Sequence, residues 1–210
     1  MINLLTTLAL SLTLLFYVPN NHGYSVGDKA LDFKLKNIDG NFISLATDAT
    51  NKGYIIVFTC NSCPTSVAYE DRIIALDNKY RSKGYPVIAI NPNDPVVKPA
   101  DSFENMKKRA REKAFPFAYV FDATQEITLA YGATNTPHAY VVERVEQDYV
   151  VRYIGAIDNN SRKANLANKH YVEDAVDNLL IEKPVEVSAT KAIGCSIKWS
   201  AASKEKRDEG

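Results

Sequence analysis

The chain has 210 residues, which is enough for one domain with a proper core and some appendages. Its 46% hydrophobic and 24% charged residues are typical of a globular protein and exclude a disordered or fibrous chain. The 25 Lys and Arg residues balance the 25 Asp and Glu residues, so no net charge favours binding to nucleic acid or to anionic lipid.

The N-terminal segment is apolar and resembles a secretory signal peptide. No charged side chain precedes Asp28 and Lys29, and the apolar stretch of roughly 15 residues is shorter than the ~20 that span a bilayer as a helix. We therefore expect residues 1–23 to be a signal peptide and the protein to be exported, either periplasmic or secreted. No Lys or Arg precedes the apolar stretch and no clear Ala-x-Ala site follows it, so an uncleaved membrane anchor and a buried amphipathic helix remain alternatives.

Residues 24–182 have the pattern of one α/β domain. Two alternating runs around Asp39-Gly40 predict an N-terminal β-hairpin, and the continuous apolar run 54–58 predicts a strand buried on both faces. Further strands are expected at 87–90, 117–121, 139–142 and 149–154, and helices at 67–80, 103–113 (with Ser102 as N-cap), 125–131 and 171–181. This order predicts a mixed central sheet flanked by helices, followed by an irregular C-terminal extension, residues 183–210, with a frayed, charged tail.

Two of the three cysteines, Cys60 and Cys63, directly follow the strand 54–58 and precede a helix. A thiol attacks as a thiolate, and the unpaired amides and dipole of a helix N-terminus stabilise that anion. Cys60 would attack a substrate disulfide, and Cys63, one helical turn further on, would resolve the mixed disulfide. Pro64 suits the first turn of the helix, where N–H groups have no intrahelical partner.

This pair has two other interpretations. Buried cysteines can be inert core residues. A zinc site needs more ligands than two, and His138 and Cys195 could complete a set of four, although no second Cys-x-x-Cys or His-x-x-x-His pair occurs. We expect neither a metal nor an organic cofactor.

The segment Thr136-Pro137 precedes the predicted strand 139–142. If that strand lies beside the cysteines, the peptide bond before Pro137 is a candidate for the cis form, and the backbone of Thr136 could pair with an extended substrate peptide. An ordinary trans proline that bounds a strand is the alternative.

These residues resemble the thioredoxin superfamily, and the opening GDKALDF (27–33) with its hairpin is similar to the redoxin (alkyl hydroperoxide reductase/thiol-specific antioxidant) branch. A bacterial group of exported thioredoxin-like proteins is more similar still, over about residues 24–199. The segments that carry this resemblance are FTCNSCP (58–64), YEDR (69–72), INPND (90–94), SFENM (102–106), TPH (136–138), GAID (155–158) and GCSIKW (194–199). The resemblance implies a thioredoxin fold, Cys60 as nucleophile, Cys63 as resolving thiol and Pro137 in cis.

The sequence departs from this family pattern in two ways. The residues between the cysteines are Asn61-Ser62 rather than Gly-Pro, and no Trp precedes Cys60, which leaves the direction of electron flow open. Neither cysteine is preceded by Thr at the third position, as the peroxidase pattern Pro-x-x-x-Thr-x-x-Cys requires. This absence lowers the expectation of peroxidase activity.

Three residues are auxiliary candidates. Cys195 either returns to the dithiol and exchanges with Cys63 or is a buried, unreactive thiol. Glu70 either moves protons for the resolving cysteine or is simply solvated. His138 either polarises the substrate side of the site or is a hydrogen-bonded strand residue. The basic run 106–113 is expected to be the solvated face of a helix.

The sequence therefore predicts a thiol–disulfide oxidoreductase that uses Cys60 and Cys63. A peroxiredoxin-like thiol peroxidase and a redox-inert peptide-binding module are the alternatives. The expected partners are protein disulfides or small thiols and an unidentified redox partner, with no nucleic acid, and with a membrane only if the N-terminal segment is uncleaved.

Overall fold

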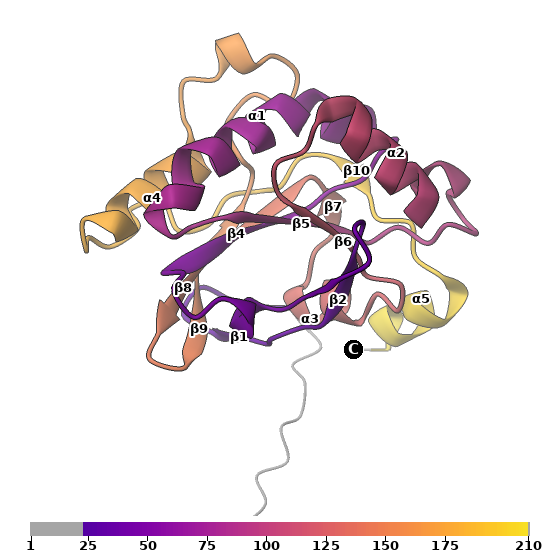
Figure 1. The fold of residues 1–210 in the computed structure, drawn as a ribbon, viewed down its shortest axis with the longest axis horizontal. Coiled ribbons are helices and arrows are strands. Elements are labelled where there is room, and N and C mark those ends of the chain that lie inside the picture. The colour runs from indigo at the N-terminus through magenta and orange to yellow at the C-terminus, as the bar shows by residue number, and fades with distance from the viewer. Residues whose placement is uncertain (1–22, 210) are drawn as a thin grey trace, which may run out of the picture.

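A computed structural model describes residues 23–209, which form a mixed eight-stranded sheet with helices on both faces (Figure 1). The predicted signal peptide, except Gly23, lies outside these residues. The strand order is β1-β9-β8-β4-β5-β6-β2-β3, with β4 parallel to β5 and antiparallel to β8. The strands are β1 (Lys29–Ala30), β2 (Leu35–Asn37), β3 (Phe42–Ile43), β4 (Gly53–Phe58), β5 (Val87–Asn91), β6 (Ala118–Phe121), β8 (His138–Val145) and β9 (Asp148–Gly155).

Two short strands outside this sheet, β7 (Asn135–Thr136) and β10 (Cys195–Ser196), pair with each other. The helices are α1 (Pro64–Tyr80), α2 (Phe103–Lys113), α3 (Glu126–Tyr131), α4 (Tyr171–Leu180) and α5 (Ala201–Asp208). Figure 1 shows α1, α2 and α4 above the sheet and α3 below it. The mixed α/β fold predicted from the sequence is confirmed.

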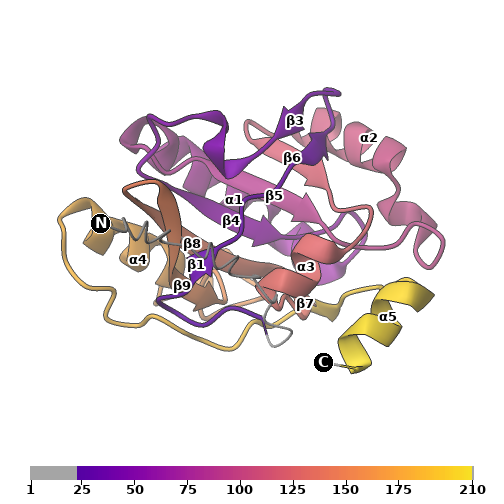
Figure 2. The ribbon, with the colours of Figure 1, turned by 90° about the horizontal axis from the view of Figure 1, so that it is seen from below.

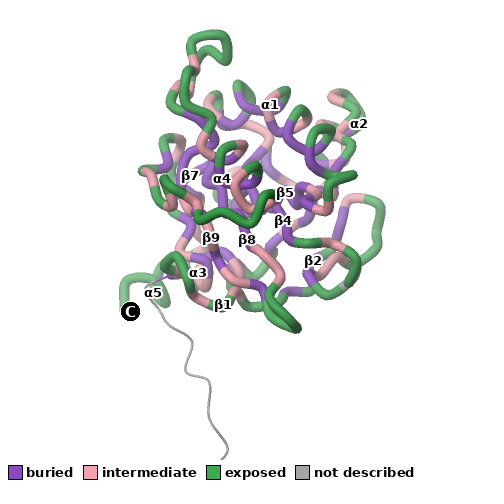
Figure 3. The backbone as a smooth tube through the Cα atoms, turned by 90° about the vertical axis from the view of Figure 1, so that its left-hand side faces the viewer, coloured by how far each residue is buried: buried purple, intermediate pink, exposed green. Residues whose placement is uncertain are grey.

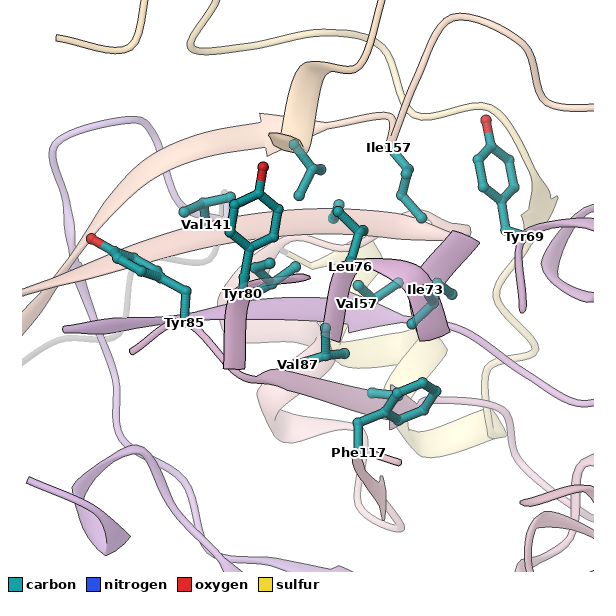
Figure 4. Close-up of a cluster of buried hydrophobic side chains, with 14 of the residues drawn as sticks. Val57, Tyr69, Ile73, Leu76, Tyr80, Tyr85, Val87, Phe117, Val141 and Ile157 are labelled. Atoms are coloured by element: carbon teal, nitrogen blue, oxygen red, sulfur yellow. The ribbon is translucent and has the colours of Figure 1, made fainter. Parts of the chain in front are cut away.

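The sheet separates two hydrophobic cores, because successive side chains of a strand point to opposite faces. In β4, Ile55 and Val57 face the core under α1, α2 and α4, whereas Ile56 and Phe58 face the core that includes α3. Figure 4 shows the first core, in which side chains of α1 pack on β4, β5 and β8. The central strands are buried along their length and the connecting segments are largely exposed (Figure 3). This confirms the prediction that strand 54–58 is buried on both faces.

The predicted hairpin is confirmed in β2 and β3, although β1 leaves it to pair with β9 at the far edge of the sheet. The predicted helix boundaries agree within a few residues, and Ser102 caps α2 by accepting a hydrogen bond from the N–H of Asn105.

The expectation of a frayed tail is wrong, because residues 201–208 form α5. Ser200 caps this helix by accepting from the N–H of Ser203, and the buried Ser203 donates its hydroxyl to the Thr124 carbonyl. Figure 2 shows α5 close to α3, at the end of the chain. Within residues 23–209, no helix is both long and apolar enough to cross a bilayer.

The register of the sheet brings the cysteines to Pro137. Phe58, the last residue of β4, pairs with His138, the first residue of β8. The strands are antiparallel, so the residues after Phe58 lie beside those before His138. The peptide bond between Thr136 and Pro137 is cis, as predicted.

Candidate active site

The segment Cys60–Cys63, named here the dithiol loop, connects β4 to α1. Helix α1 begins at Pro64 and Cys63 is its N-cap, so both cysteines precede the helix. The prediction that Cys63 lies one turn inside the helix is wrong. Pro64 lies at the start of the helix, as predicted, where its missing N–H costs no hydrogen bond.

Cys60 is a free, buried thiol with only 4% of its surface exposed. Its Sγ lies 3.4 Å from the hydroxyl oxygen of Thr136 and 3.8 Å from that of Ser66. Burial raises the pKa of the Cys60 thiol, and the negative charge of Asp101 raises it further, while hydrogen bonds from Thr136, the Cys63 N–H and Ser66 oppose these effects. The sequence analysis expected the helix N-terminus to favour a thiolate. In the structure, where Cys63 is bonded to Cys195, the loss of water around the buried Cys60 sulfur outweighs the stabilisation of a thiolate by the helix N-terminus.

Cys63 is bonded to Cys195 in a disulfide that joins residues 132 positions apart, with a Cα–Cα distance of 6.1 Å. The Sγ of Cys63 also lies 3.4 Å from the carbonyl oxygen of Thr136. Of the two readings of Cys195 from the sequence, the return of its segment to the dithiol is therefore confirmed. The alternative, in which Cys195 is a buried, unreactive free thiol, is wrong.

Strand β10 carries Cys195 to this position by pairing antiparallel with β7, so that Cys195 is opposite Thr136. The side-chain amide of Asn135 donates to the Gly194 carbonyl at 3.0 Å. A Cβ at residue 194 would overlap the Thr136 carbonyl, so only glycine allows this approach. The backbone of Thr136, which the sequence predicted to be open to a substrate peptide, is covered by the chain's own C-terminal extension.

Asp101 holds the dithiol loop from the opposite side. It ends a single 3-10 turn, Pro99–Asp101, and is fully buried. Its Oδ1 accepts hydrogen bonds from the N–H groups of Asn61 and Ser62, at 2.9 and 3.0 Å. Its Oδ2 accepts from the Ser62 hydroxyl at 3.1 Å and from the Asn93 side-chain amide at 2.7 Å. The two residues between the cysteines are therefore fixed by one carboxylate.

Glu70 is buried in α1 and forms a two-pronged ion pair with Arg109 of α2, with both N–O distances 2.7 Å. The solvated alternative for Glu70 is wrong. The basic run 106–113 is likewise not a purely solvated face, because Arg109 turns toward α1 to meet this carboxylate. A small pocket beside Cys60 is lined by the residues Thr59, Cys60, Asn61, Glu70, Ile73, Phe115, Phe117 and Tyr119.

His138 is buried at the start of β8, directly after Pro137. Its Nδ1 accepts a hydrogen bond from the Thr134 N–H at 3.4 Å, and its ring packs on that of Tyr140 with centroids 4.8 Å apart. Burial lowers the pKa of His138 from 6.5 to about 4, so the ring is neutral at pH 7. This environment fits the hydrogen-bonded strand residue that the sequence analysis considered.

Sequence reasoning missed several residues of this site, among them Asn93, Asp101 and Arg109. Each lies outside the cysteine and proline motifs. Asn93 and Asp101 lie between β5 and α2 and Arg109 lies on α2, and the hydrophobic pattern of the sequence does not show what these segments pack against. Among residues 23–209, no three His, Cys, Asp or Glu side chains are gathered so that they could hold a metal ion.

Comparison with known proteins agrees with this fold. An uncharacterized conserved protein from Geobacillus kaustophilus is 38% identical with a TM-score of 0.77, covering 84% of this chain and 93% of its own. A hypothetical protein from Sinorhizobium meliloti 1021 is 30% identical with a TM-score of 0.77, covering 85% of this chain and 97% of its own.

The thioredoxin domain of a thiol-disulfide oxidoreductase from Bacteroides vulgatus shares the fold, at 18% identity and a TM-score of 0.51, covering 63% of this chain and 91% of its own. No protein of curated function matches the sequence. The model of the AhpC/TSA family matches residues 26–159, more than half of the chain. The chain therefore belongs to the AhpC/TSA family, in the redoxin branch of the thioredoxin superfamily.

Proposed function

We propose that the protein is a thiol–disulfide oxidoreductase in which Cys60 and Cys63 exchange disulfides with protein or small-thiol substrates. The observation that carries this proposal is the convergence of the dithiol loop with Thr136 and cis Pro137, which are more than 70 residues away in the chain. The Thr136 side chain contacts the Cys60 sulfur and its carbonyl contacts the Cys63 sulfur, at 3.4 Å each. Membership of the redoxin branch supports the same chemistry.

The reaction begins with all three cysteines reduced. The Cys60 thiolate attacks one sulfur of the substrate disulfide, which forms a mixed disulfide and releases the first substrate thiolate. The Cys63 thiolate then attacks the Cys60 sulfur, which releases the second substrate thiolate and leaves a Cys60–Cys63 disulfide. The substrate gains two electrons and the dithiol loses two. The reverse sequence would oxidise a substrate dithiol.

Insulin reduction by dithiothreitol tests this proposal, with wild type compared with Cys60→Ser. Serine cannot form the mixed disulfide, so we expect the variant to lose nearly all acceleration over dithiothreitol alone. Lys191→Ala, which changes an exposed side chain outside the dithiol loop, is the control and should keep the wild-type rate. Equal rates for wild type and Cys60→Ser would overturn the proposal.

A thiol peroxidase is a second candidate, favoured by the small pocket in which the free Cys60 lies. A peroxide would oxidise the Cys60 thiolate to a sulfenic acid, and condensation with the Cys63 thiol would release water and form the disulfide. Peroxide consumption under reductant, lost in Cys60→Ser, would support this activity. The missing Thr-x-x-Cys pattern makes it the weaker candidate.

A redox-inert peptide-binding module is a third candidate, in which an extended peptide would displace β10 from the Thr136 backbone beside cis Pro137 without redox chemistry. Replacement of both Cys60 and Cys63 distinguishes this function. Unchanged peptide affinity in the double variant, together with no loss of insulin reduction, would favour the binding module over the oxidoreductase.

Export remains a proposal as well. A disulfide within the described residues is typical of oxidising compartments and rare in the cytosol. Expression of the full chain in a bacterial host followed by fractionation would test this. We expect the protein in the periplasm or medium, with residues 1–23 removed. Recovery of an unprocessed protein from the cytosol would contradict export, and recovery from the membrane would indicate the uncleaved anchor.

A further inference from the structure

The segment that carries Cys195 is fixed to the domain on both sides. On its N-terminal side, Thr190 accepts and donates hydrogen bonds with β9 and the turn after it: its N–H donates to the Ile154 carbonyl at 2.9 Å, and its hydroxyl accepts from the Ala156 N–H at 3.0 Å. The Thr190 hydroxyl also lies 2.6 Å from that of Tyr153.

On its C-terminal side the segment is held still more firmly. The Lys198 N–H donates to the side-chain oxygen of Asn93 at 2.8 Å, and the Ser200 N–H donates to that of Gln125 at 2.9 Å. The side chain of Ile197 is buried in the second hydrophobic core. None of these contacts involves the disulfide, so we expect Cys195 to stay close to Cys63 when the disulfide is reduced.

Between these two fixed points, β10 lies along the backbone of Thr136. This is the position that an extended substrate peptide would take beside cis Pro137. The cysteine of β10 is bonded to Cys63 of the dithiol loop, whereas the mixed disulfide of the proposed reaction joins the substrate to Cys60. The C-terminal extension therefore takes the place of a substrate backbone, with its cysteine on the resolving thiol rather than on the attacking one.

We propose that Cys195 is a third redox cysteine, which exchanges with the Cys60–Cys63 pair and makes Cys63–Cys195 the resting disulfide of the oxidised protein. This proposal rests on the proposed oxidoreductase function and extends it. A consequence is that in the oxidised protein the disulfide fastens β10 to the substrate edge and leaves Cys60 as a free thiol.

The exchange conserves the number of disulfides. Starting from Cys60–Cys63, the Cys195 thiolate attacks the Cys63 sulfur; the Cys63–Cys195 bond forms, the Cys60–Cys63 bond breaks, and Cys60 leaves as a thiolate that takes up a proton. No external oxidant or reductant is needed. In the reverse direction Cys60 attacks Cys63 and Cys195 leaves. Because Cys195 is tethered beside the site, its attack is intramolecular and has a high effective concentration.

The fate of Cys60 after this exchange fits its surroundings. The Cys60 sulfur is buried and lies near the Asp101 carboxylate, and both features favour the neutral thiol as the product against the opposing hydrogen bonds of Thr136 and Ser66. The protonated form then resists attack on Cys63, and the Cys63–Cys195 bond persists.

A quenched time course tests the proposal. Reduced full-length protein is oxidised with glutathione disulfide, samples are quenched in acid and alkylated, and the disulfides are mapped by mass spectrometry. We expect Cys60–Cys63 to appear first and Cys63–Cys195 to replace it while the total number of disulfides stays constant. If Cys195 is alkylated, and is therefore a free thiol, at every time point, the proposal is overturned. A Cys63–Cys195 bond that forms with no preceding Cys60–Cys63 bond, and so acts as a purely structural staple, would overturn it too.

An equilibrium measurement provides a second test. In glutathione buffers, Cys195→Ser can form only the Cys60–Cys63 disulfide, so its equilibrium constant for oxidation is expected to fall at least about tenfold, which corresponds to a potential about 30 mV less reducing. An unchanged constant would overturn the proposal. Lys191→Ala, which changes an exposed side chain in the same segment, is the matched control and is expected to leave the constant unchanged.

Thermal unfolding under full reduction separates chemistry from folding, since neither wild type nor Cys195→Ser then contains a disulfide. We expect similar stability for the two proteins. The proposal for Cys195 can fail while the proposed oxidoreductase function still holds. If Cys195 never forms a disulfide but insulin reduction still depends on Cys60, only the third redox cysteine is refuted.

Discussion

The two flanks of the dithiol loop are built from different chemistry. One flank consists of polar and charged groups with fixed partners, all buried except the half-buried Arg109; they are Glu70, Asn93, Asp101, Arg109 and Tyr119. The other flank, formed by Thr136, Pro137, His138 and Cys195, consists of backbone, a neutral ring and a disulfide. We name them the charged flank and the exchange flank.

This difference separates geometry from reactivity. A buried carboxylate that accepts several hydrogen bonds holds its donors in one arrangement, because losing any of them leaves an unsatisfied charge. A disulfide can instead be remade in another pairing without changing the rest of the fold. The charged flank therefore fixes Asn61 and Ser62, and the exchange flank carries the bond that changes. Four predictions test this comparison.

The largest effect on stability is expected for Arg109→Ala on the charged flank. It leaves the buried Glu70 carboxylate with only the more distant Lys113 ammonium, 3.7 Å away, and should lower the free energy of unfolding by about 3 kcal/mol. Urea denaturation measures this change. Lys108→Ala removes a positive charge from the exposed face of the same helix and should change stability by less than about 0.5 kcal/mol. Equal effects of the two substitutions would show that the Glu70–Arg109 pair does not stabilise this flank.

Asp101→Asn is expected to cost roughly 2 kcal/mol, because its new NH₂ group would face the Asn93 amide that now donates to Oδ2. It should also lower the pKa of the Cys60 thiol by removing a nearby negative charge. The measurement is the rate of Cys60 alkylation by iodoacetamide as a function of pH, in oxidised protein whose only free thiol is Cys60.

The alkylation profile should shift to lower pH in Asp101→Asn. Glu104→Gln, which changes an exposed carboxylate near the start of α2, is the control and should leave the profile in place. A profile that is the same in wild type and Asp101→Asn would remove Asp101 from the electrostatics of the site.

On the exchange flank, His138 makes stability depend on pH. Its folded pKa of about 4 is below the ordinary 6.5, so between these values the unfolded chain binds a proton that the folded chain does not. Stability should therefore fall as the pH drops from 7 to 4.5, by about 2 kcal/mol from this residue. Urea denaturation of wild type and His138→Gln at both pH values isolates this contribution. A loss of the same size in both proteins would mean that His138 is not responsible.

The smallest effect is expected for Ser62→Ala, which removes one hydrogen bond to Asp101 and leaves the bonds from the two backbone N–H groups. The cost should be about 1 kcal/mol, with little change in insulin reduction. Denaturation and the insulin assay measure the two quantities. A large loss of activity would show that the Ser62 hydroxyl takes part in the reaction rather than in the geometry of the loop.

Much of the fold follows from local patterns. The continuous apolar run of β4 and the Ser102 cap of α2 depend on residues close together in the chain, and both are found as predicted. The tail was misjudged because α5 forms where Ser203 is buried against the loop before α3, a contact with residues about 80 positions earlier. Composition indicates a charged surface segment but not what it packs against.

The sequence by itself determined which reactive groups the protein has. These are three cysteines, two of which lie in one loop after a buried strand, and the Thr136-Pro137 segment before the strand expected beside that loop. Only the tertiary structure decided which sulfurs are bonded, since β10 brings Cys195 to Cys63 across 132 residues. It also decided that Cys60 is buried near Asp101, which reverses the effect on its pKa expected from a helix N-terminus alone. Motif spacing reports neighbours along the chain, whereas the pairing and charge of a buried sulfur depend on neighbours in space.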